Sequence, residues 1–374
     1  MNKVATMEPR ARAELFAETA ARMGVADAIV EKDFWVCWTL KQLFSNRAFE
    51  GRLLFKGGTS LSKIYRAINR FSEDIDLAVD YVALGFTGDN DPRQENISKT
   101  KRNAILDEMM KTCRGYIAGE FLETLRKQCV EVLGRQDGWR LEVSKVDPNA
   151  VQFEYPRAST KGLEYLNPQV VLELGTHAEF VPHDRFTIRS FAGEQFPNVV
   201  KDRDISVEAL LAKRTFWEKA TILRAEYHRL AEKALPDRYS RHYYDVAMMT
   251  EGKIKDEALA DKGLLGQVVK HKETFYPSGW ARYDLARPGS LRLVLPENRL
   301  NALYTRPPKI ERAIDLAMKQ ETAALQERAQ VADEKSPDYL PGSYHPRSQA
   351  RRGRTSSGKN LSATNRSNCV SCAL

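Results

Sequence analysis

The 374-residue sequence has no run of 18 or more apolar residues, which excludes a membrane-spanning helix. Its N-terminus, MNKVATMEPRARAELF, is charged and amphipathic and lacks the apolar core of a secretory signal. Charged residues make up 29% of the chain and hydrophobic residues 42%, which is ordinary for a soluble globular protein. We therefore expect a cytoplasmic protein that is long enough for two domains, each with its own hydrophobic core.

The sequence also has no cluster of cysteines and histidines. Three of the five cysteines, Cys37, Cys113 and Cys129, lie in helical patterns where small buried thiols are expected. Cys369 and Cys372 form a single C-x-x-C that has no second half and no histidine nearby. The six histidines are too dispersed for a zinc site or a nucleophile–base pair. Zinc-dependent and cysteine-dependent chemistry are therefore not indicated.

Positive charge is scarce outside the C-terminal end of the chain. The net charge is +8, and residues 341–374 account for +6 of it because they hold six basic residues and no acidic residue. The rest of the chain carries only +2. Composition therefore gives no support for a nucleic-acid-binding surface on the body of the protein.

Hydrophobic periodicity predicts a mixed first part of the chain. A period of 3.6 residues predicts helices over 8–23, 26–44 and 95–133. Alternation of apolar and polar residues predicts strands at 53–55, 74–79, 141–143, 151–155, 170–174 and 186–188. We expect these strands to form a mixed sheet of five or six strands with helices packed on it, which is an α+β fold.

The second part of the chain has a helical pattern. Helices are expected at 206–233, with Ser206 as the N-cap, and at 239–251, 255–271 and about 308–329. The sequence beyond about residue 331 cannot bury enough apolar surface to fold. The expected domains are 1–200, a mixed domain with N-terminal helices, 201–330, a helical domain, and 331–374, a disordered basic tail.

The clearest chemical pattern lies in residues 53–79, LLFKGGTSLSKIYRAINRFSEDIDLAV. It predicts a strand, a Gly-Gly turn, a short helix and a second strand that carries Asp74 and Asp76. Alternate residues of a strand point to the same face, so these two carboxylates repel each other unless a cation such as Mg²⁺ lies between them. Free backbone N–H groups at the GGTS of residues 57–60 favour a phosphate. The combination indicates chemistry on a nucleoside triphosphate.

These residues resemble a known superfamily. A Gly-Gly or Gly-Ser pair, a short helix and Asp-x-Asp on a strand are similar to the nucleotidyltransferases of DNA polymerase beta type. Within that superfamily, KGGTSL followed by RFSEDIDL resembles the AbiEii/AbiGii toxin family. Its members are the toxin halves of bacterial toxin–antitoxin and abortive-infection systems. The resemblance covers roughly residues 26–305, and on this basis residues 1–200 are expected to be the catalytic domain.

The resemblance implies transfer of a nucleoside monophosphate from an NTP to an acceptor hydroxyl, with release of pyrophosphate. Two Mg²⁺ ions at Asp74 and Asp76 would bridge the triphosphate and activate the attacking oxygen. The residues predicted to bind the nucleotide are Lys56, Gly57, Gly58, Thr59, Ser60 and Ser72. The acceptor implied by the resemblance is the 3′ end of tRNA, and the implied protein partner is an antitoxin encoded alongside.

Members of the superfamily use a third carboxylate on a neighbouring strand. Glu173 is the best candidate because it interrupts the apolar strand VVLELG, where a charge is seldom buried without a partner. A glutamate that faces water at the edge of the sheet is the alternative interpretation. Asp80 and Glu154 are weaker candidates for the third metal-binding carboxylate.

Two charged residues on predicted helices match family motifs. The neighbours of Lys219 three and four residues away are largely apolar, so its ammonium group either extends to solvent or contacts an anion. By resemblance, Lys219 binds or neutralises the triphosphate, and Lys213 is the second candidate for this role. Asp245, in RYSRHYYDVAMM, matches a family aspartate. It either pairs with Arg241 or orients Lys219 or the attacking hydroxyl.

Other interpretations stay open at the level of sequence. The acceptor is either RNA or, as elsewhere in the superfamily, a protein side chain or a small molecule. A binding module with a degenerate site, which acts by protein contact or through its basic tail, is the non-enzymatic alternative. The run Glu31-Lys32-Asp33 also recurs in the family, and its pattern indicates ordinary charge on a helix surface.

Overall fold

A computed structural model describes residues 1–299 except 73, 135–137, 159–166, 231–232, 234–238, 288 and 297–298. The helix expected near 308–329, the basic tail and the C-x-x-C motif lie outside the described residues. No helix in the described part of the chain is both long and apolar enough to cross a membrane.

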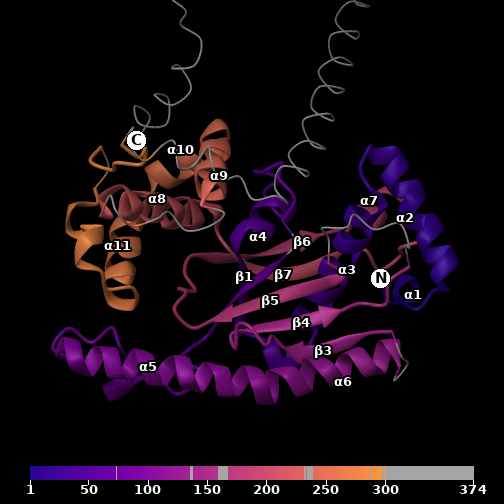
Figure 1. The fold of residues 1–374 in the computed structure, drawn as a ribbon, viewed down its shortest axis with the longest axis horizontal. Helices are drawn as coiled ribbons and strands as arrows, with labels where there is room; N and C mark the ends of the chain where they lie inside the picture. The colour runs from indigo at the N-terminus through magenta and orange to yellow at the C-terminus, as the bar shows by residue number, and fades with distance from the viewer. Residues whose placement is uncertain are drawn as a thin grey trace, which may run out of the picture.

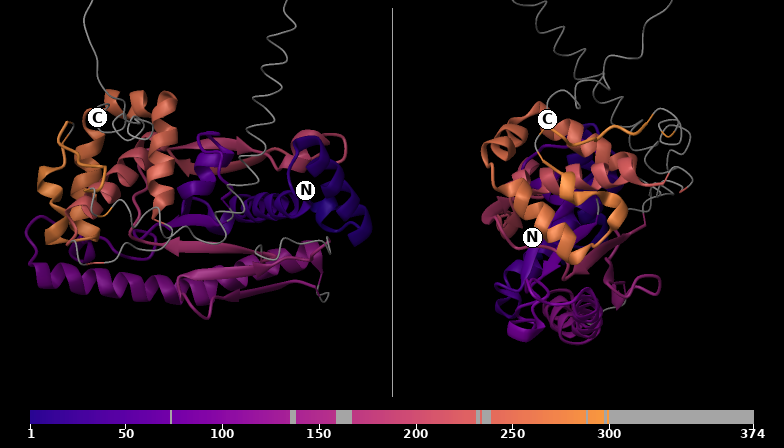
Figure 2. Two further views of the ribbon diagram at one scale, coloured as in Figure 1. Left: turned by 45° about the horizontal axis from the view of Figure 1, so that its top comes forward. Right: turned by 90° about the vertical axis from the view of Figure 1, so that its left-hand side faces the viewer.

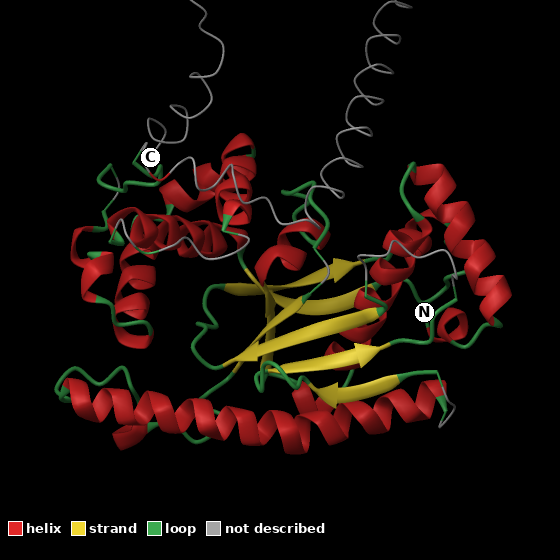
Figure 3. Cartoon of the chain, in the orientation of Figure 1, coloured by secondary structure: helices red, strands yellow, loops and turns green. Residues whose placement is uncertain are grey.

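Seven strands form one mixed sheet in the order β3-β4-β5-β2-β1-β7-β6 (Figure 1 and Figure 3). The central strand β2 is antiparallel to β1 and parallel to β5, and β1 is parallel to β7. The strands are β1 (Leu53–Lys56), β2 (Ile75–Val79), β3 (Arg140–Val143), β4 (Ala150–Glu154), β5 (Gln169–Gly175), β6 (His183–Ile188) and β7 (Ile205–Leu210). The predicted α+β fold with a mixed sheet is confirmed, and all six predicted strands are present.

The seventh strand was predicted as the start of a helix. Ser206 lies inside β7 and is not an N-cap, and the following helix begins at Ala212. The sequence ISVEAL is short and mostly apolar, so periodicity alone cannot separate a strand from a helix. The neighbouring strands decide the conformation. The backbone N–H and C=O groups at the edges of β6 and β1 need hydrogen-bond partners, and β7 supplies them as an extended strand, antiparallel to β6 and parallel to β1.

The helices of the first part of the chain surround the sheet. They are α1 (Asn2–Ala5), α2 (Pro9–Met23), α3 (Asp27–Phe44), α4 (Gly57–Lys63), α5 (Lys99–Tyr116), α6 (Leu122–Leu133) and α7 (Phe191–Gln195), with the short helices η1 (Arg47–Phe49) and η2 (Gly88–Asn90). A π-helical turn, η3 (Ile117–Phe121), joins α5 to α6, and the three run as one long rod along the sheet (Figure 2). This rod confirms the helix predicted over 95–133.

The helices of the second part pack together at one end of the sheet (Figure 1). They are α8 (Ala212–His228), α9 (Ser240–Glu251), α10 (Lys253–Ala260) and α11 (Leu264–Phe275), followed by η4 (Gly279–Ala281) and η5 (Tyr283–Leu285). The single helix predicted over 255–271 is therefore two helices. Their shared core includes Phe216, Trp217 and Val268 and also Leu61 of α4, which joins this group to the first part of the chain. The domain boundaries at residues 200 and 330 stay predictions.

The prediction that Glu31-Lys32-Asp33 is surface charge is wrong. The three residues are only 2%, 3% and 3% exposed, because α3 contacts the sheet as well as α2, α6 and α7. Each charge has a polar partner in place of water. Glu31 accepts a hydrogen bond from the backbone N–H of Ala158, and Lys32 donates to the carbonyl of Asn167.

Asp33 connects the buried helix α3 to the short helix α4. Its carboxylate forms an ion pair with Lys63, the last residue of α4, and accepts a hydrogen bond of 2.7 Å from the backbone N–H of Phe191. The recurring run is therefore part of the support of the Gly-Gly turn, which lies at the other end of α4.

Candidate functional site

The Gly-Gly turn lies between β1 and α4 and is shaped by close contacts with side chains. Gly57 has φ +80°, and a Cβ there would lie 1.7 Å from Oδ2 of Asp76. A Cβ on Gly58 would lie 2.7 Å from Nη2 of Arg70 and 2.9 Å from Oγ of Ser72. Both positions need glycine because a carboxylate and a guanidinium group occupy the space that a side chain would fill.

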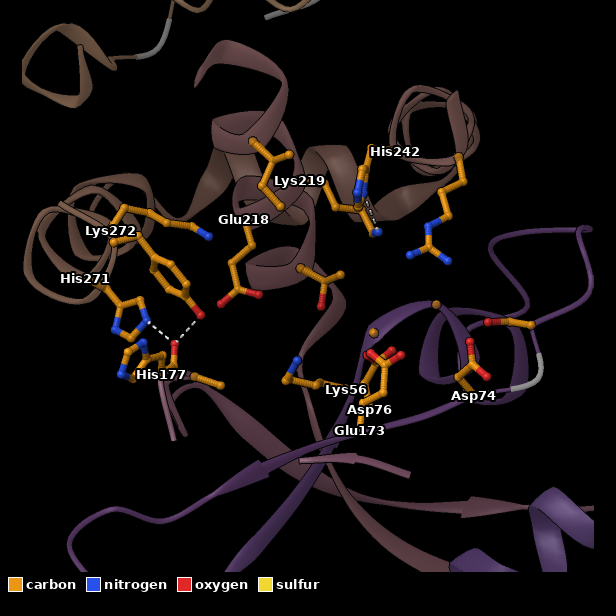
Figure 4. A pocket seen from close by; sticks show the side chains of 18 of the residues that line it. Lys56, Asp74, Asp76, Glu173, His177, Glu218, Lys219, His242, His271 and Lys272 are labelled. Atoms are coloured by element: carbon orange, nitrogen blue, oxygen red, sulfur yellow. Dashed lines mark hydrogen bonds between the residues drawn. The ribbon is translucent and has the colours of Figure 1, made fainter. Parts of the chain in front are cut away.

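Asp76 and Glu173 are register partners on the adjacent parallel strands β2 and β5. Paired residues on neighbouring strands have side chains on the same face, about 5 Å apart. Partial burial and the negative charges of Asp76 and Asp74 raise the pKa of Glu173 to about 6. The prediction that Asp74 and Asp76 share one face of a strand is wrong: Asp74 precedes β2 by one residue, and its carboxylate lies apart from those of Asp76 and Glu173 (Figure 4). Glu173 therefore lies close to two further negative charges.

The hydroxyl groups of the turn serve different roles. Thr59 and Ser60 are buried, and their hydroxyls donate to the carbonyls of Asp74 and Gly57, respectively. Oγ1 of Thr59 also lies 2.9 Å from Oγ of Ser72. Ser72 lines the cavity beside the turn, whereas Thr59 and Ser60 do not. Thr59 and Ser60 therefore hold the turn in shape through protein contacts, and only Ser72 presents its side chain to the cavity.

Asp245 joins the two parts of the protein through a buried charge cluster. Its carboxylate is fully buried and accepts two hydrogen bonds from Arg70, at 2.7 and 2.8 Å, while Nζ of Lys219 lies 2.9 Å away. Of the two alternatives for Asp245, the structure has the contact with Lys219 and not the pair with Arg241. Burial alone would raise the pKa of Asp245, but the hydrogen bonds from Arg70 and the charge of Lys219 hold it below the usual value.

Lys219 is buried, with 8% of its surface exposed, and it lines the cavity. Burial lowers the pKa of its ammonium group against the opposing effect of Asp245. Nδ1 of His242 lies 3.4 Å from Nζ of Lys219, and burial together with the charges of Lys219 and Arg241 lowers the pKa of His242 to about 3. His242 is therefore neutral at physiological pH, so Nδ1 can accept a hydrogen bond from Lys219.

The predicted residues meet in one cavity of about 240 Å³ between the sheet and the helices α8, α9 and α11 (Figure 4). Those that line it are Lys56, Gly57, Gly58, Ser72, Asp74, Asp76, Glu173 and Lys219. Asp245 lies directly behind the wall. The second candidates lie elsewhere: Lys213 pairs with Asp261, Asp80 accepts from the N–H of Val82, and Glu154 lies near Arg140.

Several residues of the cavity wall were not among the predicted site residues, and four of them come from two helices of the second part of the chain. Arg241 and His242 come from α9, and Lys272 and Tyr276 come from α11 and the residue that follows it. The first pair lies in the motif RYSRHYYDVAMM close to the predicted Asp245, so the sequence carried a signal for these two residues. The second pair lies in a segment without a recognised motif, and only the packing of α11 brings it to the site.

The donor set of the cavity suits a hard divalent cation. Carboxylate oxygens are the ligands that Mg²⁺ prefers, and a cation would offset both the burial and the neighbouring negative charges that raise the pKa of Glu173. In the described part of the chain, no group of three histidine, cysteine, aspartate or glutamate side chains is arranged to hold a metal ion. Of the three carboxylates, those of Asp76 and Glu173 are paired in register on adjacent strands, whereas Asp74 lies outside the strand.

Comparison with known proteins gives a family match. The family model described as "Nucleotidyl transferase AbiEii toxin, Type IV TA system" matches residues 38–338. No curated protein sequence matches the chain. Among solved structures, the nucleotidyltransferase toxin MenT4 from Mycobacterium tuberculosis is similar, with 16% identity and a TM-score of 0.41 over 84% of this chain and 98% of that one. At that level of likeness nothing further follows from MenT4 for this chain.

Proposed function

Because the chain belongs to the AbiEii family of nucleotidyltransferase toxins of type IV toxin–antitoxin systems, we propose that it transfers a nucleoside monophosphate from an NTP to an acceptor hydroxyl with the help of Mg²⁺. One observation carries this proposal. The in-register carboxylates of Asp76 and Glu173 lie directly beside the Gly57 turn, so a cation and a phosphate would bind side by side in one cavity.

The charges near the turn favour a triphosphate. Arg70 and Lys219 are both positively charged and contact the carboxylate of Asp245. Arg241 adds a further positive charge to the cavity wall. Burial lowers the pKa of Lys219, and an anion beside it would reverse this shift. We therefore assign the β- and γ-phosphates to the side of the cavity formed by the Gly-Gly turn, Ser72 and these cations.

Asp76 and Glu173, with Asp74 in the same cavity, are the residues that would hold Mg²⁺. When bound, Mg²⁺ neutralises charge on the phosphates and makes the attacking hydroxyl more acidic. The protein itself orients the triphosphate. Gly57 and Gly58 let the phosphates approach the backbone, and Lys219, held by Asp245, contributes a fixed positive charge.

We propose the 3′ end of tRNA as the acceptor and a cognate antitoxin as the protein partner. Membership of a toxin family supports both proposals, because modification of an essential RNA would arrest growth and would need a neutralising partner. Such an acceptor would place the reaction in the cytoplasm, where abortive infection would also act against phage. Transfer to a protein or a small molecule is the competing outcome of the test below.

The test uses the purified full-length protein with each of the four α-labelled NTPs, Mg²⁺ and total tRNA. Labelled RNA is expected with the wild type and is lost when EDTA removes the metal. Asp76→Asn should lower the rate at least about a thousandfold, because a metal ligand is removed. Asp80→Asn, a carboxylate of the same region that lies outside the cavity, is the matched control and should retain activity.

If a cell lysate is used and the label appears in protein and not in RNA, the acceptor is a protein side chain. Absence of label with all four NTPs, both in RNA and in the lysate, would refute nucleotidyl transfer by this chain.

A further inference from the structure

Two ammonium groups of the cavity wall, Lys56 and Lys272, differ from Arg70 and Lys219 in their electrostatic surroundings. Among the described residues, neither has a carboxylate within ion-pair distance, whereas Arg70 and Lys219 share Asp245. Burial and the nearby charge of Lys56 lower the pKa of Lys272, and Glu218 opposes this effect only in part. Two neighbouring cations that have no carboxylate within ion-pair distance favour the binding of an anion between them.

Lys272 is next to an aromatic ring that is both exposed and fixed. Nζ of Lys272 lies 4.5 Å from the centroid of Tyr276, which is 44% exposed. The hydroxyl of Tyr276 donates to the carbonyl of His177 at 2.9 Å, and Nε2 of His271 donates to the same oxygen at 3.1 Å. The ring of His271, only 6% exposed, stacks on Phe275. Tyr276 is therefore held in place and still presents accessible ring surface.

The cavity wall that contains Lys56 and Lys272 lies on one side of the carboxylates of Asp76 and Glu173. The side assigned to the phosphates of the NTP is the opposite one. In Figure 4, Asp76 and Glu173 lie between Asp74 on one side and Lys56 and Lys272 on the other. In phosphoryl transfer the attacking and leaving oxygens lie roughly in line across the reacting phosphorus. If pyrophosphate leaves toward the Gly-Gly turn, the attacking hydroxyl arrives from the side of Lys56 and Lys272.

The same wall continues into a second cavity of about 210 Å³. Lys56, His177 and Tyr276 line both cavities, and the second one extends to Cys113 of α5 and to Asn149. The side from which the acceptor hydroxyl approaches therefore has space for further parts of the acceptor molecule, in addition to the reacting hydroxyl group.

We propose that Lys272 and Tyr276 form the acceptor subsite, in which Lys272 binds a phosphodiester of a single-stranded RNA 3′ end and Tyr276 stacks on one of its bases. A cation beside a fixed aromatic ring is the combination that proteins use to bind single-stranded nucleic acid. The assignment rests on the proposed function, since the in-line argument presupposes nucleotidyl transfer. It goes beyond that function by separating the residues that bind the acceptor from those that bind the NTP.

The experiment measures two binding constants for the full-length protein. Fluorescence anisotropy follows a short fluorescein-labelled single-stranded RNA, and calorimetry follows a non-hydrolysable NTP with Mg²⁺. Lys272→Gln should weaken RNA binding about tenfold and make the slope of log K against log salt shallower by about 0.7, as for one lost phosphate contact. Tyr276→Ala should weaken it at least about fivefold through lost stacking. The affinity for the NTP should not change in either variant.

Three variants control for structural effects. Lys272→Arg keeps the positive charge and should restore RNA binding, and Tyr276→Phe keeps the ring and should bind within about threefold of the wild type. Lys270→Gln removes a lysine of the same helix that is 72% exposed and pairs with Glu95, so it should change neither constant. Thermal unfolding establishes that each variant is folded.

A loss of NTP affinity with unchanged RNA affinity in Lys272→Gln and Tyr276→Ala would assign this wall to the nucleoside and overturn the proposal. Failure of the wild type to bind the RNA, with or without the NTP, would overturn it as well. Failure of the proposed function is a separate result, since it appears as an absence of NTP binding and of label transfer by the wild type.

Discussion

Asp76 and Glu173 occupy paired positions on the parallel strands β2 and β5, although they lie far apart in the sequence. The pairing places two carboxylates side by side at the cavity that also contains the Gly57 turn and Lys219. Their mutual repulsion is visible in the raised pKa of Glu173, which partial burial and the charges of Asp76 and Asp74 produce. The site is therefore less stable without a cation than a neutral arrangement would be.

The first prediction concerns the stability of the metal-free protein as a function of pH. The folded-state pKa of Glu173 is about 6, above its unfolded value, so the folded state retains this proton to higher pH than the unfolded chain. The stabilisation is complete below the unfolded pKa of about 4.5 and is lost as pH rises through about 6. Glu173→Gln should therefore exceed the wild type in Tm by about 1–3 °C at pH 8 and lose this advantage below about pH 4.5.

The effect of added Mg²⁺ on the Tm is a second measurement of the same charges. Mg²⁺ should raise the Tm of the wild type at pH 8 and have little effect on Glu173→Gln, because the variant has lost one ligand. Glu142→Gln, on β3 outside the cavity, is the control. Identical pH profiles of Tm for the wild type and Glu173→Gln would contradict the prediction.

The second prediction concerns Gly57→Ala, with Gly24→Ala as its matched control. Both glycines have positive φ, +80° and +71°, so alanine introduces backbone strain of about 1 kcal/mol at either position. Gly24 has no atom within 4 Å of the added Cβ, whereas Gly57 has the carboxylate of Asp76. Gly57→Ala should therefore lower kcat/KM at least about tenfold because Asp76 must move. Urea denaturation and transfer kinetics measure the two effects, and equal activity in both variants would contradict the prediction.

The third prediction concerns the buried cluster of Asp245. Asp245→Asn removes the buried carboxylate that both Arg70 and Lys219 contact, which should lower the free energy of unfolding by about 3–5 kcal/mol. Asp261→Asn breaks the more exposed pair with Lys213 and should lower it by less than about 1 kcal/mol. Denaturant unfolding compares the two variants.

The same cluster has a defined pH dependence. The pKa of Asp245 lies below its usual value in the folded protein, so its stabilising effect is present above about pH 4 and is lost as pH falls further. The deficit of Asp245→Asn should therefore be constant between about pH 5 and pH 8. A deficit that grows steadily over that range would show that another group titrates with the cluster.

The fourth prediction concerns the support of the Gly-Gly turn from α3. Asp33→Asn leaves Lys63 buried beside a neutral partner and should destabilise the protein by about 3 kcal/mol. It should also raise KM for the NTP several-fold, because α4 loses its connection to α3. Glu14→Gln breaks a helix pair with Arg10 that is almost fully exposed, and it should change stability by less than about 0.5 kcal/mol. A stable Asp33→Asn protein with unchanged KM would contradict a supporting role.

Local patterns identified most of the elements and eight of the residues that line the candidate cavity. Alternation found six of the seven strands, and the helices of 8–23, 26–44 and 95–133 are present as predicted. The exception, β7, is a short apolar segment whose conformation depends on its strand partners β1 and β6. The burial of Glu31, Lys32 and Asp33 also could not be predicted from the sequence. Three consecutive charged residues on a helix are buried only when the surrounding elements supply polar partners for them.

The sequence by itself determined the Gly-Gly turn and the strand that carries Asp76, since both depend on backbone geometry over a few residues. It also determined the family, because the motifs are contiguous runs that a sequence comparison can match. Only the tertiary structure decided that Asp245 binds Arg70 and Lys219, that Glu173 is the register partner of Asp76, and that Lys272 reaches the same cavity. Those relationships join segments from the sheet, α8, α9 and α11, and their physical basis is the packing of the helices on the sheet and the balance of charge in the cavity between them.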